Sequence, residues 1–423
     1  MLDLKFIREN VELVKKGLAA KNVKLDLSAL LEMDEKRRAE LKELEDLRNK
    51  QNIANDEISK NLGNEEKKRD VIVKVKALTM KVSVIAPQVK ITTENIEEIL
   101  FTIPNLPHSS VPIGSAEKNK EVRKWGEPRK FDFKPKTHVE IAEALDIIDF
   151  KRAAKITGSN FVVFKNEGAR LERALINFMI DLHTQKHGYT EIFPPFLVNR
   201  ASMTGTGQLP KMEEDMYKLA ADDFFLIPTA EVPITNLHRD EILDEKELPI
   251  FYTGYTACFR REAGSYGKDI KGLVRVHQFD KVELVKFVKP GTSYDELEKL
   301  VANAEATLQL LGLPHRVILL ASGDLSFAAS KCYDLESHAP GLDKWLEVSS
   351  CSNFEDFQAR RANIRFKSKT DKKVNFVHTL NGSGVALART MIAILENYQT
   401  QEGGVLIPEA LQSYMGGQKK IGK

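Results

Sequence analysis

The chain has 423 residues, of which 63 are basic and 61 acidic, so its net charge is +2. This length is enough for two or three domains with a substantial core, and the near balance of charge excludes a global positive field as the source of any nucleic-acid binding. The three cysteines, Cys258, Cys332 and Cys351, show no CxxC spacing, which argues against a disulfide framework and against a zinc site.

The N-terminus, MLDLKFIREN, lacks the apolar core of a signal peptide. No uncharged run approaches the roughly 20 residues that a transmembrane helix needs. Together with cysteine usage that fits a reducing compartment, these features predict a cytoplasmic protein without membrane contact.

Residues 1–105 are almost free of aromatic side chains and are densely charged. Their apolar residues form two helical stripes, and the second advances in the steps of four and three residues that are typical of coiled coils. The first stripe is headed by Leu41, Leu44 and Leu47, and the second consists of Val71, Val75, Leu78, Val82, Ile85 and Val89. We predict an antiparallel hairpin of two long helices that turns at residues 61–64 and projects from the body, because its outer faces are too charged to be buried.

Two features of this hairpin matter for its shape and its partners. Pro87 lies inside the second helix, where its missing amide hydrogen and the clash with the preceding turn predict a kink or a break. A basic cluster near the tip either meets a polyanion or is an ordinary solvated face. The cluster consists of Lys60, Lys67, Lys68 and Arg69.

The segment IPNLPHSSVP, residues 103–112, has the composition of a linker. It separates an N-terminal domain, residues 1–105, from a globular domain, residues 106–423. In the globular domain a helix near Gly168–His187 precedes a strand at Thr190–Val198, whose adjacent prolines indicate a sheet edge or an interface.

His183 and His187 lie four residues apart, a spacing that invites a metal-binding interpretation. The glutamate of an HExxH motif is missing, so we interpret both as surface residues near a helix end.

The stretch TACFRREAGSYGKDIKGLVRVHQFDKVE, residues 256–283, predicts two strands joined by a mobile basic loop. Arg260, Arg261 and Glu262 stand at the end of the first strand. An arginine in this place suits phosphate oxygens, because its planar guanidinium donates two hydrogen bonds at once and stays charged. The alternative is a surface hairpin with solvated charges.

Further polar side chains follow apolar runs. FFLIPTAEVP predicts a strand followed by Thr229 and Glu231, a pair that could hold an ammonium group or could merely cap a helix. KWLEVSSCS alternates as a strand does. It carries Glu347, Ser349 and Ser350.

The segment VHTLNGSGVALARTMIAILEN, residues 377–397, predicts a strand, a glycine turn and a long apolar helix with Arg389 near its start. Gly382–Gly384 does not complete the GxSxG motif of hydrolases. A Walker A loop and a GxGxxG dinucleotide motif are also missing from the sequence.

Taken together, these segments resemble the class II aminoacyl-tRNA synthetases and, along essentially the whole chain, the bacterial-type seryl-tRNA synthetases. The helix and strand that end at Phe193–Pro195 resemble the first, dimer-forming class motif. FRREAGSYG with RVHQFDKVE resembles the second motif, and LNGSGVALARTMIAILEN the third. The serine-specific marks are TAEVP, HQFDKVE, EVSSCSNFEDFQARR and the N-terminal helical arm.

The resemblance implies an α+β fold, with an antiparallel β-sheet flanked by helices and an N-terminal antiparallel α-helical coiled-coil arm. It implies a homodimer that activates L-serine with ATP and Mg²⁺ to seryl-adenylate, and that transfers the seryl group to the 3′ end of serine tRNA. Charging of a selenocysteine tRNA is implied where the organism has one. The arm is expected to contact the long variable arm of the tRNA, while the acceptor end enters the catalytic domain.

The resemblance also assigns roles to residues. Arg260 is expected to hold the α-phosphate of ATP, and Arg389 its triphosphate tail. Glu262 would meet the adenine amino group and Phe279 would stack on the ring. The ATP-binding positions are Arg260, Arg261, Glu262, Phe279, Glu347, Val348, Ser349, Ser350 and Arg389, of which Glu347 and Ser350 match the magnesium ligands. The serine-binding positions are Thr229, Ala230, Glu231, Glu283 and Ser383, of which Glu283 is expected to face the hydroxyl or the amine of the substrate.

Two other functions compete with this interpretation. A synthetase-like ligase could load an amino acid on a carrier protein, but such homologues generally lack the long arm. A coiled-coil interaction protein could carry an inactive catalytic domain, but Arg260, Glu347 and Arg389 are all present. One departure from the family pattern is the second arm helix, which is rich in Val and Ile and contains Pro87.

Overall fold

The computed structural model describes residues 1–60, 65–262, 271–370 and 372–422. The chain divides into two compact units, and each is considered by itself. One unit comprises Leu2–Ala19 and Val23–Ile103, and the other comprises Met1, Ala20–Asn22 and Pro104–Lys423. The turn predicted at residues 61–64 lies outside the described residues, as do Gly264, Gly267 and Lys268 of the predicted basic loop.

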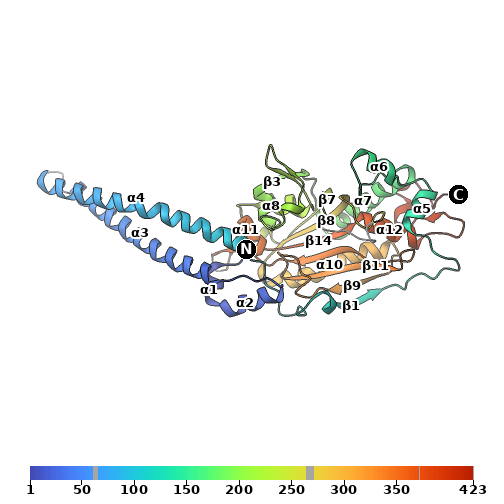
Figure 1. Ribbon diagram of the computed structural model, residues 1–423, viewed down its shortest axis with the longest axis horizontal. Helices are drawn as coiled ribbons and strands as arrows, with labels where there is room; N and C mark the ends of the chain where they lie inside the picture. Colours follow the sequence, from blue (N-terminus) through green and yellow to red (C-terminus); the bar gives the residue numbers. More distant parts are fainter. Residues whose placement is uncertain (61–64, 263–270, 371, 423) are drawn as a thin grey trace. The chain divides into compact units, whose positions relative to one another are not determined.

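The smaller unit is helical and consists of α1 (Leu4–Glu9), α2 (Val11–Ala20), α3 (Ser28–Lys60) and α4 (Glu65–Thr102). Figure 1 shows α3 and α4 side by side along their length. Gln51 Nε2 donates to Thr79 Oγ1 over 2.9 Å, and Thr92 Oγ1 donates to Glu40 Oε2 over 3.2 Å. Because later positions on α4 meet earlier positions on α3, the two helices are antiparallel. The predicted hairpin of long helices is therefore confirmed.

The predicted stripes form the seam between α3 and α4. Leu44, Leu47 and Ala54 of α3 are buried, as are Val71 and Val89 of α4. Most of the charged side chains on the two helices are exposed, as expected for a helix pair that buries one face only, while Asp34 of α3 is buried. The outer face of α4 is less polar than predicted, because it also exposes apolar side chains. These are Val73, Met80, Val84 and Ile91.

The possible helix break at Pro87 does not occur, since α4 continues through this residue. A proline inside a helix costs about 3 kcal/mol because it removes one hydrogen bond and crowds the preceding turn. Here Pro87 is exposed, while Val89, one turn or less away, is buried in the seam. Packing on both sides of the proline holds the helix together where its own backbone is weakened.

The larger unit is built on an eight-stranded sheet with the order β1-β9-β10-β11-β14-β8-β7-β2. Neighbouring strands are antiparallel, except that β2 runs parallel to β7. The strands are β1 (Lys120–Trp125), β2 (Thr190–Glu191), β7 (Ile250–Phe259), β8 (Gln278–Val288), β9 (His315–Leu319), β10 (Lys331–Ala339), β11 (Lys344–Asn353) and β14 (His378–Ala386). The predicted antiparallel sheet is confirmed.

Helices and short strands complete this unit. The helices are α5 (His138–Ala144), α6 (Phe150–Ile156), α7 (Asn166–Lys186), α8 (Arg200–Thr206), α9 (Glu231–Thr235), α10 (Ser293–Leu310), α11 (Phe357–Ala362), α12 (Leu387–Asn397) and α13 (Glu409–Gln412). The short strands are β3 (Leu197–Asn199), β4 (Lys218–Leu219), β5 (Phe224–Leu226), β6 (Ile242–Asp244), β12 (Arg365–Lys367), β13 (Val374–Phe376), β15 (Val405–Leu406) and β16 (Lys420–Ile421).

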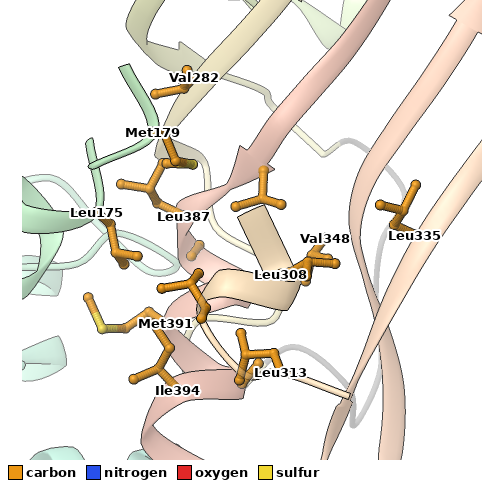
Figure 2. Packing of buried hydrophobic residues seen from close by; sticks show 14 of the residues in the cluster. Leu175, Met179, Val282, Leu308, Leu313, Leu335, Val348, Leu387, Met391 and Ile394 are labelled. Carbon is orange, nitrogen blue, oxygen red and sulfur yellow. The ribbon is translucent and has the colours of Figure 1, made fainter. Parts of the chain in front are cut away.

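The core joins α7, α10 and α12 to the sheet (Figure 2). On α12, Leu387, Met391 and Ile394 follow one another at helical spacing and are fully buried. They meet Leu175 and Met179 of α7 in the same cluster. Each such side chain contributes roughly 1.5–3 kcal/mol of hydrophobic free energy. This packing fixes the helix that carries Arg389 against the sheet.

The predicted strand at Thr190–Val198 is wrong in its extent. Only Thr190–Glu191 pairs with the large sheet, as its edge strand β2, and the chain joins a different, three-stranded sheet at β3. Pro194 and Pro195 have no amide hydrogen to donate to a ladder, so the pairing ends before them. The predicted edge position is confirmed.

The predicted glycine turn at Gly382–Gly384 is also wrong, because β14 continues through it with a shift of register between Ser383 and Val385. A Cβ atom on Gly384 would lie 2.8 Å from His183 Nε2, which explains the need for glycine. His183 itself is fully buried rather than on the surface, and its Nδ1 lies 2.9 Å from Nδ1 of His187. In the described part of the chain, no helix has the length and apolarity needed to cross a bilayer.

Candidate active site

A cavity of about 850 Å³ opens in the larger unit, and residues from well-separated segments, many of them polar, line it. Those that the sequence analysis named are Thr229, Glu231, Arg260, Glu262, Phe279, Glu283, Glu347, Val348, Ser349, Ser350, Ser383 and Arg389. Ala230 and Arg261 do not line it. Ala230 is fully buried in an apolar cluster, while Arg261 Nη1 donates to the backbone of Glu214 over 3.1 Å.

Arg260 follows the last residue of β7 and is fixed by the neighbouring backbone. Its amide donates to the carbonyl of His277 over 2.9 Å, which continues the pairing of β7 with β8. Its Nε donates to the carbonyl of Pro228 over 3.3 Å, and its guanidinium carbon lies 5.4 Å from the centre of the Phe279 ring. The side chain therefore presents a cation beside an aromatic face.

Glu262 lies just beyond Arg260 with a backbone φ of 50°. This left-handed conformation costs a non-glycine residue roughly 1–2 kcal/mol, and it points to a local constraint. The Glu262 carboxylate forms an ion pair with Arg275, which the sequence analysis did not single out. Arg275 lies shortly before the first residue of β8, and it also lines the cavity.

At another part of the cavity wall, β8 supplies two buried charges. Lys281 Nζ lies 2.6 Å from Glu283 Oε2, and both side chains are less than one tenth exposed. Thr229 Oγ1 donates to the same Oε2 over 2.9 Å. Glu283 Oε1 is buried without a hydrogen-bond partner among the described residues. One oxygen of this carboxylate is thus held by the protein, and the other needs a donor.

Glu231, the first residue of α9, is also buried in the cavity wall. Gln358 Nε2 donates to its Oε1 over 2.6 Å. Burial, and then the neighbouring Glu283, raise the pKa of the Glu231 carboxyl to about 7, although the Gln358 hydrogen bond opposes the shift. Two carboxyl groups close together in a buried site favour a bound cation.

The third part of the wall comes from β10, β11 and α12. Arg389 Nη1 donates to the backbone oxygen of Glu347 over 2.9 Å and lies 3.3 Å from its Oε2. Asp334 of β10 stands opposite Ser350 of β11 in the ladder. Burial, and then the charge of Glu347, raise the pKa of Asp334 to about 8. This region combines acidic oxygens, a hydroxyl and a nearby guanidinium.

Several residues in or beside the cavity wall were not found from the sequence: Lys281, Arg275, Asp334 and Gln358. Lys281 could have been found, because it lies two residues before Glu283 on a strand and therefore faces the same side. Asp334 has no local signal, and Gln358 lies in a segment that the family resemblance marked without giving this residue a role. The basic residues of the arm, Lys60, Lys67, Lys68 and Arg69, belong to the ends of α3 and α4 that flank residues 61–64.

Comparison with known proteins identifies the family of the chain. Residues 1–107 match the family profile described as the seryl-tRNA synthetase N-terminal domain, and residues 215–398 match the tRNA synthetase class II core domain (G, H, P, S and T). The serine–tRNA ligase of Caldanaerobacter subterraneus subsp. tengcongensis is 58% identical over 98% of this chain and 98% of its own. That of Geobacter sulfurreducens is 54% identical over 100% of both chains.

The solved structures extend the comparison to three dimensions. The seryl-tRNA synthetase from Pyrococcus horikoshii complexed with ATP has a TM-score of 0.91 and 40% identity, and it covers 100% of this chain and 99% of its own. The cytoplasmic serine–tRNA ligase from Naegleria fowleri in complex with AMP has a TM-score of 0.87 and 33% identity, covering 100% and 98%. The chain belongs to the seryl-tRNA synthetases, the class II aminoacyl-tRNA synthetases that use ATP to join L-serine to tRNA.

Proposed function

We propose that the cavity holds ATP and L-serine together and that its residues have the roles expected from the sequence. The observation that carries this proposal is the convergence of the predicted ATP-binding and serine-binding side chains on one cavity. They come from segments as distant as Thr229 and Arg389. A solvated surface hairpin would not bring such residues together.

In this proposal Arg260 contacts the α-phosphate, and Phe279 stacks on the adenine ring. The position of the Arg260 guanidinium near the Phe279 ring supports both roles, because ring and phosphate would then occupy adjacent places. Glu262 accepts from the adenine amino group, and its ion pair with Arg275 orients the carboxylate. Arg389 contacts the triphosphate tail.

The reaction needs two anions to approach each other. The serine carboxylate attacks the α-phosphorus, a new oxygen–phosphorus bond forms, and the bond to the leaving pyrophosphate breaks. Arg260 reduces the repulsion between the two anions and is placed to stabilise charge on the α-phosphate in the transition state. A ribose hydroxyl of the tRNA 3′ end then attacks the seryl carbonyl and AMP leaves. Neither step requires a nucleophile from the protein.

The serine end is assigned to Glu231, Glu283, Thr229 and Ser383. Glu231 is proposed to accept from the α-ammonium group, since its carboxylate is buried next to a second acidic group. Glu283 Oε1 lacks a donor among the described residues and suits the substrate hydroxyl. A pocket of this kind selects serine by hydrogen bonding.

The residues near Glu347 fit a magnesium ion. Glu347, whose side chain is half exposed, disfavours a negative charge on the more buried Asp334, and a divalent cation would relieve this repulsion. Mg²⁺ commonly uses one or two carboxylates together with phosphate oxygens and water. Glu347 and Ser350 would hold it, and when bound it would neutralise charge on the triphosphate.

The arm is proposed to bind serine tRNA, with residues 1–105 as the tRNA-binding domain and residues 106–423 as the catalytic domain. The basic cluster near the arm tip supports this assignment, because phosphate contacts supply most of the affinity for RNA. A homodimer and the charging of selenocysteine tRNA remain predictions.

The test measures ATP–pyrophosphate exchange with each amino acid in turn and then the charging of serine tRNA. The concentration of Mg²⁺ is varied in both assays. Serine-dependent exchange with an absolute need for a divalent ion, together with serine-specific charging, is expected. Exchange without tRNA charging would favour a ligase for a carrier protein instead. The absence of both activities would favour the inactive scaffold.

A further inference from the structure

We propose that Gln358 is a positioning residue that holds the Glu231 carboxylate in place for the α-ammonium group of serine. The inference rests on the serine-binding role proposed for Glu231. Gln358 lies on α11, within the segment FEDFQARR that the sequence analysis recognised as a serine-specific mark without assigning it chemistry.

The amide of Gln358 is fully engaged. Its Nε2 donates to Glu231 Oε1 over 2.6 Å and to the carbonyl of Thr206 over 3.1 Å. Its Oε1 accepts from Thr379 Oγ1 over 2.7 Å. Gln358, Thr206 and Thr379 are at most 1% exposed, so water does not compete for these groups.

These partners also determine which way the amide faces. A flipped Gln358 would point its oxygen at two acceptors, the Glu231 carboxylate and the Thr206 carbonyl, and would lose both hydrogen bonds. Thr379, on β14, holds the amide oxygen from the other side. The amide nitrogen is therefore directed at Glu231 by contacts on two other elements.

The helix that carries Gln358 is itself attached to the cavity wall. On the same short helix, Arg361 Nε donates to the carbonyl of Thr204 over 2.7 Å, and its Nη2 donates to that of Leu209 over 2.6 Å. The segment between these two residues includes Thr206 and Gln208, which line the cavity. Gln358 is thus fixed relative to the wall it supports.

Glu231 has a specific need for such a partner. It is buried beside Glu283, and both its burial and this neighbour disfavour the ionised carboxylate that an ammonium group requires, although the charges of Lys281 and Arg260 act in the opposite direction. Among the described residues, Gln358 provides the one hydrogen bond recorded to the Glu231 carboxylate. Removing this donor should leave the carboxyl more easily protonated and free to turn, whereas contacts to ATP should be unaffected.

The experiment uses the full-length enzyme and ATP–pyrophosphate exchange. In Gln358→Met, which keeps the length of the side chain but not the donor, kcat/KM for serine should fall about 10- to 100-fold, the usual effect of losing a hydrogen bond to a charged group. KM for ATP should change less than about twofold, because Gln358 does not contact the ATP-binding residues proposed above. The acidic limb of the pH profile of kcat/KM for serine should move to higher pH by about one unit, a readout that a merely structural role would not shift.

Gln399→Met is the matched control, because Gln399 is also a buried glutamine whose amide bridges backbone groups, those of Lys136 and Glu396, outside the cavity. The Gln399→Met variant should be less stable than the wild type, but the acidic limb of its pH profile of kcat/KM for serine should not shift. If Gln358→Met fails to fold, Thr379→Val decides, since it leaves Gln358 in place but removes the hydrogen bond that holds its amide oxygen. A shifted limb supports the inference, and an unchanged one overturns it.

Glu231→Gln separates this inference from the function on which it rests. If Glu231→Gln loses serine activation while Gln358→Met and Thr379→Val keep the wild-type kcat/KM and pH limb, the positioning role is wrong and the serine site stands. If Glu231→Gln itself activates serine normally, the proposed role of Glu231 is wrong and the positioning role of Gln358 is overturned with it.

Discussion

The Lys281 ammonium lies 2.6 Å from Glu283 Oε2, in a wall where both side chains are almost completely buried. The second carboxylate oxygen, Oε1, has no partner among the described residues. A buried charge pair is stable only when its remaining hydrogen-bonding capacity is used. We therefore expect the hydroxyl of the substrate to donate to this oxygen.

The first prediction concerns selectivity. A pocket that hydrogen-bonds a hydroxyl rejects the analogue lacking it by about 10⁴–10⁵, so the wild-type enzyme should prefer serine to alanine by this order. Glu283→Ala should lower kcat/KM for serine and shrink the preference at least about 100-fold. Exchange kinetics with both amino acids measure this. Glu305→Ala, which removes a buried carboxylate paired with Arg123 outside the cavity, should keep the preference. An unchanged preference in Glu283→Ala would count against the assigned role.

The second prediction concerns the phosphate. Arg260→Ala should fold normally but lower the exchange rate about 10²–10³-fold, because one charge-assisted contact to the reacting group is lost. The rate at saturating serine and ATP is the measurement. Arg152→Ala serves as control, since Arg152 forms an exposed ion pair with Asp149 outside the cavity. Near-normal exchange in Arg260→Ala would remove its catalytic role.

The third prediction links the serine site to stability. The pKa of Glu231 is raised from 4.5 to about 7 in the fold, so ionisation of this group makes folding less favourable as pH rises through that interval. Glu231→Gln cannot ionise. It should raise the free energy of unfolding at pH 8 by up to about 3 kcal/mol, and by much less at pH 5, while serine activation is lost. Urea unfolding at the two pH values tests this, and an equal effect at both would refute the assigned cause.

Local patterns predicted most of the elements that carry the site. The alternation of KWLEVSSCS correctly indicated β11, and the apolar run after Ala386 correctly indicated α12. Both elements can be recognised from a few neighbouring residues, because each element buries one regular face of side chains.

Where a prediction from the sequence was wrong, the structure of the residue depends on a contact with a distant segment. Gly384 indicated a turn locally, but glycine is required there by the close approach of His183 from α7. For the same reason His183 could not be recognised as buried. Asp334 became visible only when the fold brought it to the cavity, since nothing in its neighbouring residues marks it. Gln358 belongs to a segment that the family resemblance marked, but its contact with Glu231 could be seen only in the fold.

The fourth prediction concerns assembly. Phe193 follows the edge strand β2 and is 73% exposed, although it contacts the Phe196 and Tyr255 rings. An exposed aromatic side chain at a sheet edge suits a two-fold interface. Light scattering at micromolar concentration should show a dimer, and Phe193→Asp should shift it toward monomer. Leu310→Asp, at an exposed leucine on α10, should not. A fully active wild-type monomer would contradict this prediction.

The last prediction concerns the arm formed by α3 and α4. Gln51 meets Thr79 and Glu40 meets Thr92, so the chain enters and leaves the hairpin at the same end. The two helices belong to a compact unit of their own, so removing them should not disturb the core that fixes the residues of the cavity. Replacing Leu27–Leu100 by a short linker should therefore keep serine-dependent exchange within about threefold of the wild type and nearly abolish charging of serine tRNA.

A milder change tests the contacts themselves. Substituting glutamine for the four basic residues near the tip should weaken tRNA binding. The slope of the logarithm of the binding constant against the logarithm of the salt concentration should become smaller in magnitude by about one for each charge removed. These residues are Lys60, Lys67, Lys68 and Arg69. Serine activation in the same preparation is the control, because none of the four belongs to the catalytic unit. A truncated enzyme that charges tRNA normally would leave the arm without its proposed role. One that loses serine activation would show instead that the hairpin is needed for the catalytic fold.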